Sequence, residues 1–451
     1  GYDPDTLSVE QALSYDLYEW YLDSQVRGHA FAYHDYPLHH FIGSYHWGVD
    51  GLFGEIHPLE STRDVEDYIT RLSLVDEQVD QLIEGLELRE ELDVIPPDFI
   101  VDLGRNSLRE YLSLGSTGSP ADAARRLHVY TRLDEALGQL EGLSAEQAQG
   151  FREAALYEIE ASFIPAFLAL NDHLDHLATI ATPDAGAWKL PDGEEYYAYM
   201  LRLETSTDLS PAEIHELGLE EVARIQAEMR EALLGLGYAE EASFRELMDR
   251  AVSEGGWFDI STPAGKDQYI ATIEGAIDRA EKAADAVFEL RPSGEVVVIG
   301  GPTGGYYVPG APDGSRPGSY HVGLEGQWRP RYSMPTVAYH ETAPGHHFQI
   351  AIAQELDLPF PRRDIRFTAY TEGWAMYAER LAWELGLYDD DPYGNLGRLQ
   401  SELLRAVRLV TDTGIHAMRW SRKQARAYMD QAMGAQPGRF SYEVDRYVVM
   451  P

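Results

Sequence analysis

The sequence predicts a mainly α-helical protein that carries one small β-sheet. Three observations indicate this fold class. Apolar residues recur at helical spacing along most of the 451 residues, and capping patterns mark helix starts. Strand-like composition is confined to residues 292–326, between turns rich in glycine and proline. The chain has no long Ser/Gly linker, internal repeat or low-complexity tract, so we expect one continuous fold.

Five long helices are expected ahead of the sheet. Apolar periodicity predicts them over residues 7–26, 121–143, 144–173, 211–236 and 266–290. The fourth helix has the clearest start, because Ser210-Pro211-Ala212-Glu213 is a capping box with proline at the first helical position.

Three short strands are expected next, over residues 295–300, 306–308 and 319–324. Two interpretations of them remain open: an edge strand could pair with an extended peptide backbone, or the strands could form a buried structural hairpin. Further helices are expected after the sheet. One begins at Pro335 and resumes through residues 348–352, one begins at Glu372, and one covers residues 402–420.

Composition limits the partners. There are 36 basic and 76 acidic residues, and a formal net charge of −40 would repel nucleic acid and anionic membranes. No apolar run reaches the length of a transmembrane helix, and the absence of cysteine excludes disulfides and thiolate zinc sites from these residues. We expect a soluble, cytoplasmic protein, or a secreted one if a leader was removed ahead of Gly1.

The most informative segment is HETAPGHH at residues 340–347, which is followed by Glu372. A catalytic zinc ion takes three protein ligands and keeps one position open for water, and two histidines with one glutamate are a standard set. Glu341 is then free to act as the general base on the zinc-bound water. The segment therefore predicts a zinc hydrolase site.

The spacing of the two histidines differs from the H-E-x-x-H pattern, in which they lie one helical turn apart. Pro344 stands four positions after His340, and neither His346 nor His347 could share an ion with His340 on an unbroken helix. Pro344 and Gly345 should make the helix bulge or break. A two-residue insertion that loops out would bring His346 to the position of the second ligand, with His347 as the alternative.

Three motifs together resemble the bacterial domain-of-unknown-function 885 family, which is grouped with the gluzincin zinc metallopeptidases. They are HETAPGHHFQ at residues 340–349, EGWAMYAE at 372–379 and DTGIH at 412–416. The resemblance implies a multi-helix, gluzincin-like metallopeptidase fold, with His340, His346 and Glu372 as zinc ligands and Glu341 as the base. The family pattern would continue past Pro451, so we expect the C-terminus to be incomplete.

Hydrolysis also needs a donor for the oxyanion of the tetrahedral intermediate, opposite the metal. The resemblance makes His416 the first candidate for this role, with Tyr447 and Arg446 behind it. Tyr320 and His321 on an expected strand are weaker alternatives.

Other polar residues have two interpretations each. Glu379 lies two helical turns after Glu372, where it could orient a ligand histidine or be an ordinary exposed carboxylate. A substrate carboxylate could be bound by Arg366, Arg419 or Arg446, which the sequence does not rank.

Six of the fifteen histidines fall in one aromatic-rich N-terminal segment: His29, His34, His39, His40, His46 and His57. They could form a second metal site or a cleft wall, or they could belong to a loop packed over the helices. Metal-ligand spacing and an accompanying carboxylate pattern are both missing, so we favour packing.

These observations predict a zinc-dependent hydrolase, first of all a metallopeptidase that acts on peptides or small amides. Residues 291–451 would form the catalytic part, and residues 1–290 a mainly helical part that covers the cleft. Two alternatives remain: a non-catalytic helical protein that binds metal or peptide, and a zinc hydrolase of non-peptide amides or esters. The retained Glu341 argues against the first, because a protein without turnover is free to lose its base.

Overall fold

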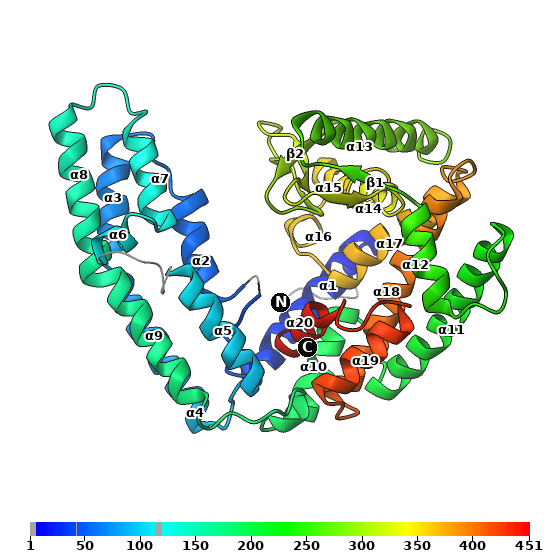
Figure 1. Ribbon diagram of the computed structural model, residues 1–451, viewed down its shortest axis with the longest axis horizontal. Coiled ribbons are helices and arrows are strands. Elements are labelled where there is room, and N and C mark those ends of the chain that lie inside the picture. Colours follow the sequence, from blue (N-terminus) through cyan, green and yellow to red (C-terminus); the bar gives the residue numbers. More distant parts are fainter. Residues whose placement is uncertain (1–5, 42, 113–119) are drawn as a thin grey trace. The chain divides into compact units, whose positions relative to one another are not determined.

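The structure, a computed structural model, describes residues 6–41, 43–112 and 120–451. Most of these residues are helical, and the strands form one three-stranded and one two-stranded sheet (Figure 1). The prediction of a mainly α-helical protein with a small sheet is confirmed. No described helix has both the length and the apolar character needed to cross a membrane.

The chain divides into two compact units. The first is built from residues 1–30 and 197–444, and the second from residues 31–196 and 445–451. This division differs from the boundary expected at residue 290, because the first helix of the chain packs with the C-terminal half. The chain passes between the units within η2 (His29–Phe31), α10 (Gly193–Thr205) and α20 (Ser441–Val449).

The second unit is helical throughout its described regular structure. Its elements are α2 (Tyr45–Gly51), η3 (Leu52–Ile56), α3 (Thr62–Leu72), α4 (Val75–Glu91), α5 (Asp98–Tyr111), α6 (Pro120–Ala124), α7 (His128–Leu137), α8 (Ala145–Glu158), η4 (Ile159–Phe163), α9 (Ile164–Leu177) and η5 (Ala187–Lys189). Their apolar faces meet in one core, where Phe163 and Phe167 are fully buried and the Tyr68 hydroxyl donates to the carbonyl oxygen of Val129 at 2.6 Å.

Two expected helices of this unit differ in detail. The helix predicted over residues 121–143 is in fact two short helices, α6 and α7, because Leu127 takes an extended backbone conformation that caps a new start. The helix predicted over residues 144–173 corresponds to α8, a π-helical turn and α9 in succession, and it ends four residues later, at Leu177.

The first unit contains the longest helices. They and their shorter neighbours are α1 (Val9–Gly28), α11 (Pro211–Gly235), α12 (Phe244–Glu254), α13 (Pro263–Ala284), α14 (Met334–Glu341), α15 (His346–Glu355), α16 (Phe360–Asp364), α17 (Thr368–Glu384), α18 (Pro392–His416) and α19 (Arg422–Ala432). The capping box at Ser210 opens α11 as predicted. Gly218 lets α11 lie close against α18, since a side chain there would collide with Val410.

The expected sheet forms from β2 (Val296–Gly301), β3 (Tyr306–Val308) and β4 (Gly318–Gly323). Its order is β2-β4-β3, with β2 parallel and β3 antiparallel to the central β4, so β3 is an edge strand. A second sheet pairs β1 (Trp257–Asp259) with β5 (Trp328–Pro330), and the sequence did not predict it because the two short strands lie about 70 residues apart and outside the segment of strand-like composition.

Candidate metal centre

Two packed layers fix the helix that carries His340 and Glu341. On one side of α14, Met334 and Ala338 pack with β4 and α13 in an apolar cluster. Next to them, Tyr339 joins a second cluster that includes α15, α17 and the alanine face of α13. His340 and Glu341 are both buried, at 6% exposure each, so the helix presents two polar side chains inside an otherwise apolar environment.

The helix breaks after Glu341, as the sequence predicted, and α15 begins at His346. The connecting residues 342–345 include a cis peptide bond between Ala343 and Pro344. The indole N–H of Trp374 donates to the carbonyl oxygen of Pro344 at 2.9 Å and so ties the connection to α17. Only glycine fits at position 345, because a methyl group there would collide with the carbonyl oxygens of His340 and Tyr339.

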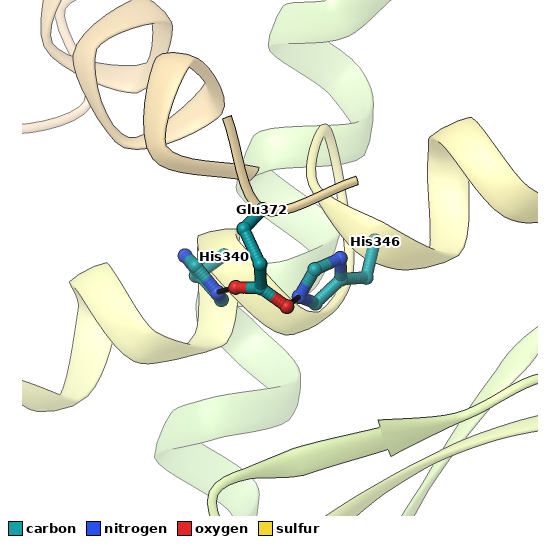
Figure 2. A group of neighbouring side chains, drawn as sticks. All are labelled: His340, His346 and Glu372. Carbon is teal, nitrogen blue, oxygen red and sulfur yellow. Dashed lines mark ion pairs between the residues drawn. The ribbon is translucent and has the colours of Figure 1, made fainter. Parts of the chain in front are cut away.

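This break brings His340 and His346 together with Glu372. The ring centres of His340 and His346 are 4.7 Å apart, and the two rings are nearly perpendicular. The Nε2 atoms of His340 and His346 each lie 3.5 Å from a different oxygen of the Glu372 carboxylate, which stands between them (Figure 2). Within residues 6–41, 43–112 and 120–451, this is the one cluster of three His, Cys, Asp or Glu side chains with ligand atoms within 4.8 Å of one another.

Glu379 orients His340. The Nδ1–H of His340 donates to Glu379 Oε1 at 2.9 Å, and Arg405 from α18 donates to the same oxygen at 3.2 Å. Glu379 is only 3% exposed, so it is no surface carboxylate, and the contact leaves His340 Nε2 directed at Glu372. Burial opposes a charge on the imidazole, but the hydrogen bonds to Glu372 and Glu379 outweigh it and raise the pKa of His340 to about 9.

His346 and His347 have different environments. Burial and the neighbouring His340 lower the pKa of His346 to about 4, and its Nδ1 is buried with no hydrogen-bond partner in the described chain. His347 is occupied instead. Its Nε2–H donates to the carbonyl oxygen of Gly294 at 3.1 Å, and its Nδ1 pairs with the Tyr307 hydroxyl at 2.9 Å. Of the two histidines, the structure therefore brings His346 to the cluster.

Glu341 is a buried carboxyl next to this cluster. Burial raises its pKa to about 7, and the negative charge of Glu372 acts in the same direction, while His340 and Arg405 oppose the shift. Glu372 is different, because hydrogen bonding to His340 lowers its pKa and its side chain is 59% exposed. The pKa of Glu341 is therefore shifted in the direction typical of a proton acceptor, and the pKa of Glu372 in the direction typical of an anionic ligand.

The candidates for an oxyanion donor differ in their surroundings, and Tyr320 lies within electrostatic reach of Glu341. His416 ends α18, roughly 16 Å along the helix axis from Arg405, where it stacks on Tyr197 and lies 4.0 Å from Asp412. Tyr320 is buried in the cluster between β4 and α14, and His321 stacks on Tyr306. Tyr447 is buried in α20 and belongs to the second unit.

The three arginines considered for binding a substrate carboxylate lie in different surroundings. Arg366 precedes α17. Burial is the main cause that lowers the pKa of His346 and raises that of Tyr307; the Arg366 charge adds to the first shift and opposes the second, so Arg366 lies within electrostatic reach of the cluster. Arg446 lies over the ring of Phe41 in the second unit. Arg419 adopts a positive φ of 58° after the end of α18.

Sequence reasoning missed Arg405, Trp374 and Tyr307 as parts of the site. Arg405 approaches from a helix more than 25 residues away in the chain, with no local motif to mark it. Trp374 lies inside the EGWAMYAE motif but was expected only to add apolar bulk.

Four of the six N-terminal histidines make structural hydrogen bonds, and among them His39 accepts from the backbone N–H of Phe41 at 3.0 Å. His46 pairs with Ser44 and Ser107, His57 with Arg71 and the carbonyl oxygen of Asp64, and His34 with the carbonyl oxygen of Pro191. Burial lowers the pKa of His39 and His46 to about 4, which is typical of neutral histidines packed in a core.

Known proteins share this fold. Over 92% of its length the chain is similar to the crystal structure of a "putative lipoprotein" from Colwellia psychrerythraea, with 32% identity, a TM-score of 0.84 and 71% of that chain covered. A second structure, a "putative lipoprotein of unknown function" from Shewanella oneidensis, has a TM-score of 0.71, and the alignment covers all of this chain and 79% of that one. Its sequence identity is 16%, so this likeness shows the fold alone. No curated protein matches the chain. The family described as "Bacterial protein of unknown function (DUF885)" matches residues 1–451, and the chain therefore belongs to this family.

Proposed function

We propose that this protein is a zinc-dependent hydrolase of the gluzincin type, and more specifically a metallopeptidase. The observation that carries the proposal is the convergence of His340, His346 and Glu372, with ligand atoms within 4.8 Å of one another, beside the buried carboxyl of Glu341. Two imidazole nitrogens and one carboxylate are a ligand set that catalytic zinc sites use. The same set in a purely structural role would not need a second, buried carboxyl next to it.

The residues present fit a zinc ion on chemical grounds. Glu379 holds the proton of His340 on Nδ1, which frees Nε2 to bind a metal, and a histidine–carboxylate contact of this kind is typical around zinc ligands. The ring of His346 is free of structural hydrogen bonds at Nδ1, unlike that of His347. When bound, zinc would lower the pKa of a water molecule and polarise the carbonyl group of the substrate.

Glu341 would supply the proton transfer. Because burial raises its pKa to about 7, the carboxyl group can both accept and return a proton near neutral pH. It would take the proton from the attacking water and deliver it to the leaving amine. Arg405, which donates to the same oxygen of Glu379, would hold that carboxylate in position against His340.

The edge strand β3 supports a peptide as the substrate. Its Tyr307 contacts His347 at the start of α15, and a backbone hydrogen bond from Tyr307 acts on Glu341. An extended peptide paired with such an edge would lie along the cluster. A zinc hydrolase of other amides or esters could use the same residues, and so could a binding protein without turnover, so activity must be tested directly.

We also propose an exported location in place of the cytoplasmic one that the sequence favoured. The relative from Colwellia psychrerythraea is named a lipoprotein, and 32% identity over 92% of this chain supports a shared compartment. Separating the expressed natural protein into cytoplasmic, periplasmic and membrane fractions tests this, and recovery in the cytoplasm alone would contradict it.

The function is tested by zinc content and peptide hydrolysis in three proteins under one set of conditions. The wild type should bind about one zinc ion per chain and cleave members of a mixed peptide library. Glu341→Gln should keep its zinc but lose about 10²- to 10⁴-fold in rate, because an amide cannot accept the proton. Glu372→Gln should lose zinc and activity together.

Three outcomes would refute all or part of the proposal. A wild-type zinc content near zero after reconstitution would remove the metal centre. Full activity in Glu341→Gln would show that this carboxyl is not the base. Zinc binding without cleavage of any peptide, ester or amide would favour the binding protein instead.

A further inference from the structure

A cavity of about 670 Å³ opens in the first unit beside α15. Its walls are mostly apolar, with side chains from α1, α15 and the segment before α17: Leu13, Leu17, Trp20, Ile350, Ala353 and Phe367. Trp20 and Phe367 touch across it, with ring centres 5.4 Å apart. A cavity of this size accommodates a large side chain or a small ligand.

The charged residues around the cavity are mainly basic, in a protein with a net charge of −40. They are Asp16, Arg362, Arg363 and Arg366. Arg362 is paired with Glu10 at 2.6 Å, and Arg363 with Asp364 at 3.0 Å. Arg366 has no carboxylate partner within the described residues, although acidic residues outnumber basic ones by two to one in the chain. An unpaired guanidinium at an apolar cavity suits a ligand that brings its own carboxylate.

The cavity adjoins the candidate metal centre. Ile350 lies four residues after His346, on the same face of α15 and one turn along. Thr371, which also lines the cavity, directly precedes Glu372. Arg366 itself interacts electrostatically with His346. The side-chain oxygen of Gln349, also in the lining, is buried with no partner in the described chain, so it can accept a hydrogen bond from a ligand N–H group.

We propose that this cavity binds the C-terminal residue of a peptide substrate, with the free carboxylate on Arg366 and a large apolar side chain against α1 and α15. The proposal rests on the proposed hydrolase function and makes the enzyme a carboxypeptidase. Water adds across the last peptide bond, the C–N bond breaks, and the leaving nitrogen takes a proton, so one amino acid is released. A side-chain carboxylate offers the same chemistry, but it would leave the apolar walls unfilled.

The first test measures binding to the metal-free protein, which does not depend on catalysis. N-acetyl-L-phenylalanine and its amide differ only in the carboxylate, and calorimetry should show roughly 10- to 100-fold tighter binding of the acid. Arg366→Gln should abolish that preference. Arg366→Lys should restore part of it, because lysine keeps the charge but lacks the planar fork. Arg250→Gln is the matched control, since Arg250 is exposed on α12 and paired with Glu254 at 2.7 Å.

The second test compares cleavage of one peptide sequence as free acid and as C-terminal amide, together with an amidated peptide that carries an internal glutamate. Only the free acid should be cleaved efficiently, and only from its C-terminal end. Equal binding of acid and amide, an unchanged preference in Arg366→Gln, or equal use of the internal glutamate would overturn the proposal. If the acid binds through Arg366 but no zinc is held and no peptide is cleaved, the hydrolase function fails while the carboxylate site stands.

Discussion

Replacing Glu379 with glutamine should weaken zinc binding and flatten its dependence on pH. Glu379 accepts hydrogen bonds from His340 at 2.9 Å and from Arg405 at 3.2 Å, and it is 3% exposed. A glutamine oxygen can still accept from His340, but it carries no charge, so the imidazole becomes a weaker ligand. Losing a carboxylate partner of this kind typically lowers metal affinity by about 10- to 100-fold, which is about 1.4–2.7 kcal/mol.

The pH profile gives the sharper part of this prediction. Although burial disfavours the charged ring, Glu372 and Glu379 raise the pKa of His340 to about 9, so below that pH a zinc ion must displace the proton on Nε2. The apparent zinc affinity of the wild type should therefore rise roughly 25-fold between about pH 7 and about pH 8.5. Removing one of the two carboxylates lowers this pKa, so the proton competes less in the variant and the rise should be only a few-fold.

The assay is competition for zinc with a chelating dye of known affinity, repeated across this pH range. Glu384→Gln is the matched control, because Glu384 lies on the same helix, is 45% exposed and pairs with Arg380 rather than with the cluster. The variant should differ from the wild type more at the upper end of the range than at the lower end. Parallel profiles for wild type and Glu379→Gln, or an equal loss in Glu384→Gln, would refute the reasoning.

Three further predictions follow from single contacts. His346→Asn should abolish zinc binding while His347→Asn keeps it, because the His347 ring is occupied by Tyr307 and Gly294; atomic absorption on both purified variants decides this. Gly345→Ala should lose zinc and lower the melting temperature, whereas Gly373→Ala, which meets open space in α17, should change neither in a thermal scan with and without zinc. Tyr68→Phe should reduce the free energy of unfolding by about 0.5–1.5 kcal/mol in a urea titration, since the buried hydroxyl bond to Val129 is lost; an unchanged midpoint would contradict this.

Features governed by neighbouring residues could be predicted from the sequence. The capping box at Ser210 predicted the start of α11, and the strand-like composition between glycine and proline turns located β2 and β4 to within one residue. The break between His340 and His346 followed from the chemistry of proline and glycine alone. The start of α18 was missed by ten residues although it was readable, since Asp391 caps the helix and Pro392 occupies its first position.

Features that depend on distant parts of the chain could not be predicted. Arg405 reaches Glu379 because α18 passes α17, and nothing near residue 405 indicates that contact. The stacking of His416 on Tyr197 was equally hidden, because the DTGIH motif does not reveal which distant residue packs against it. The assignment of α1 to the unit of the metal centre required the packed structure, since periodicity says which face of a helix is apolar and not what covers it.

The interruption of the first unit by residues 31–196 affects how the protein can be made. Gly28 packs against the ring of Tyr199, so the chain leaves this unit and re-enters it at one place. During translation, α1 is therefore synthesised long before the helices that cover it. At ordinary elongation rates the intervening stretch takes on the order of ten to thirty seconds to appear. In that interval Leu17 and Trp20 are exposed on the nascent chain and available to chaperones, and the cavity that they later line is completed only when α15 and α17 have been translated.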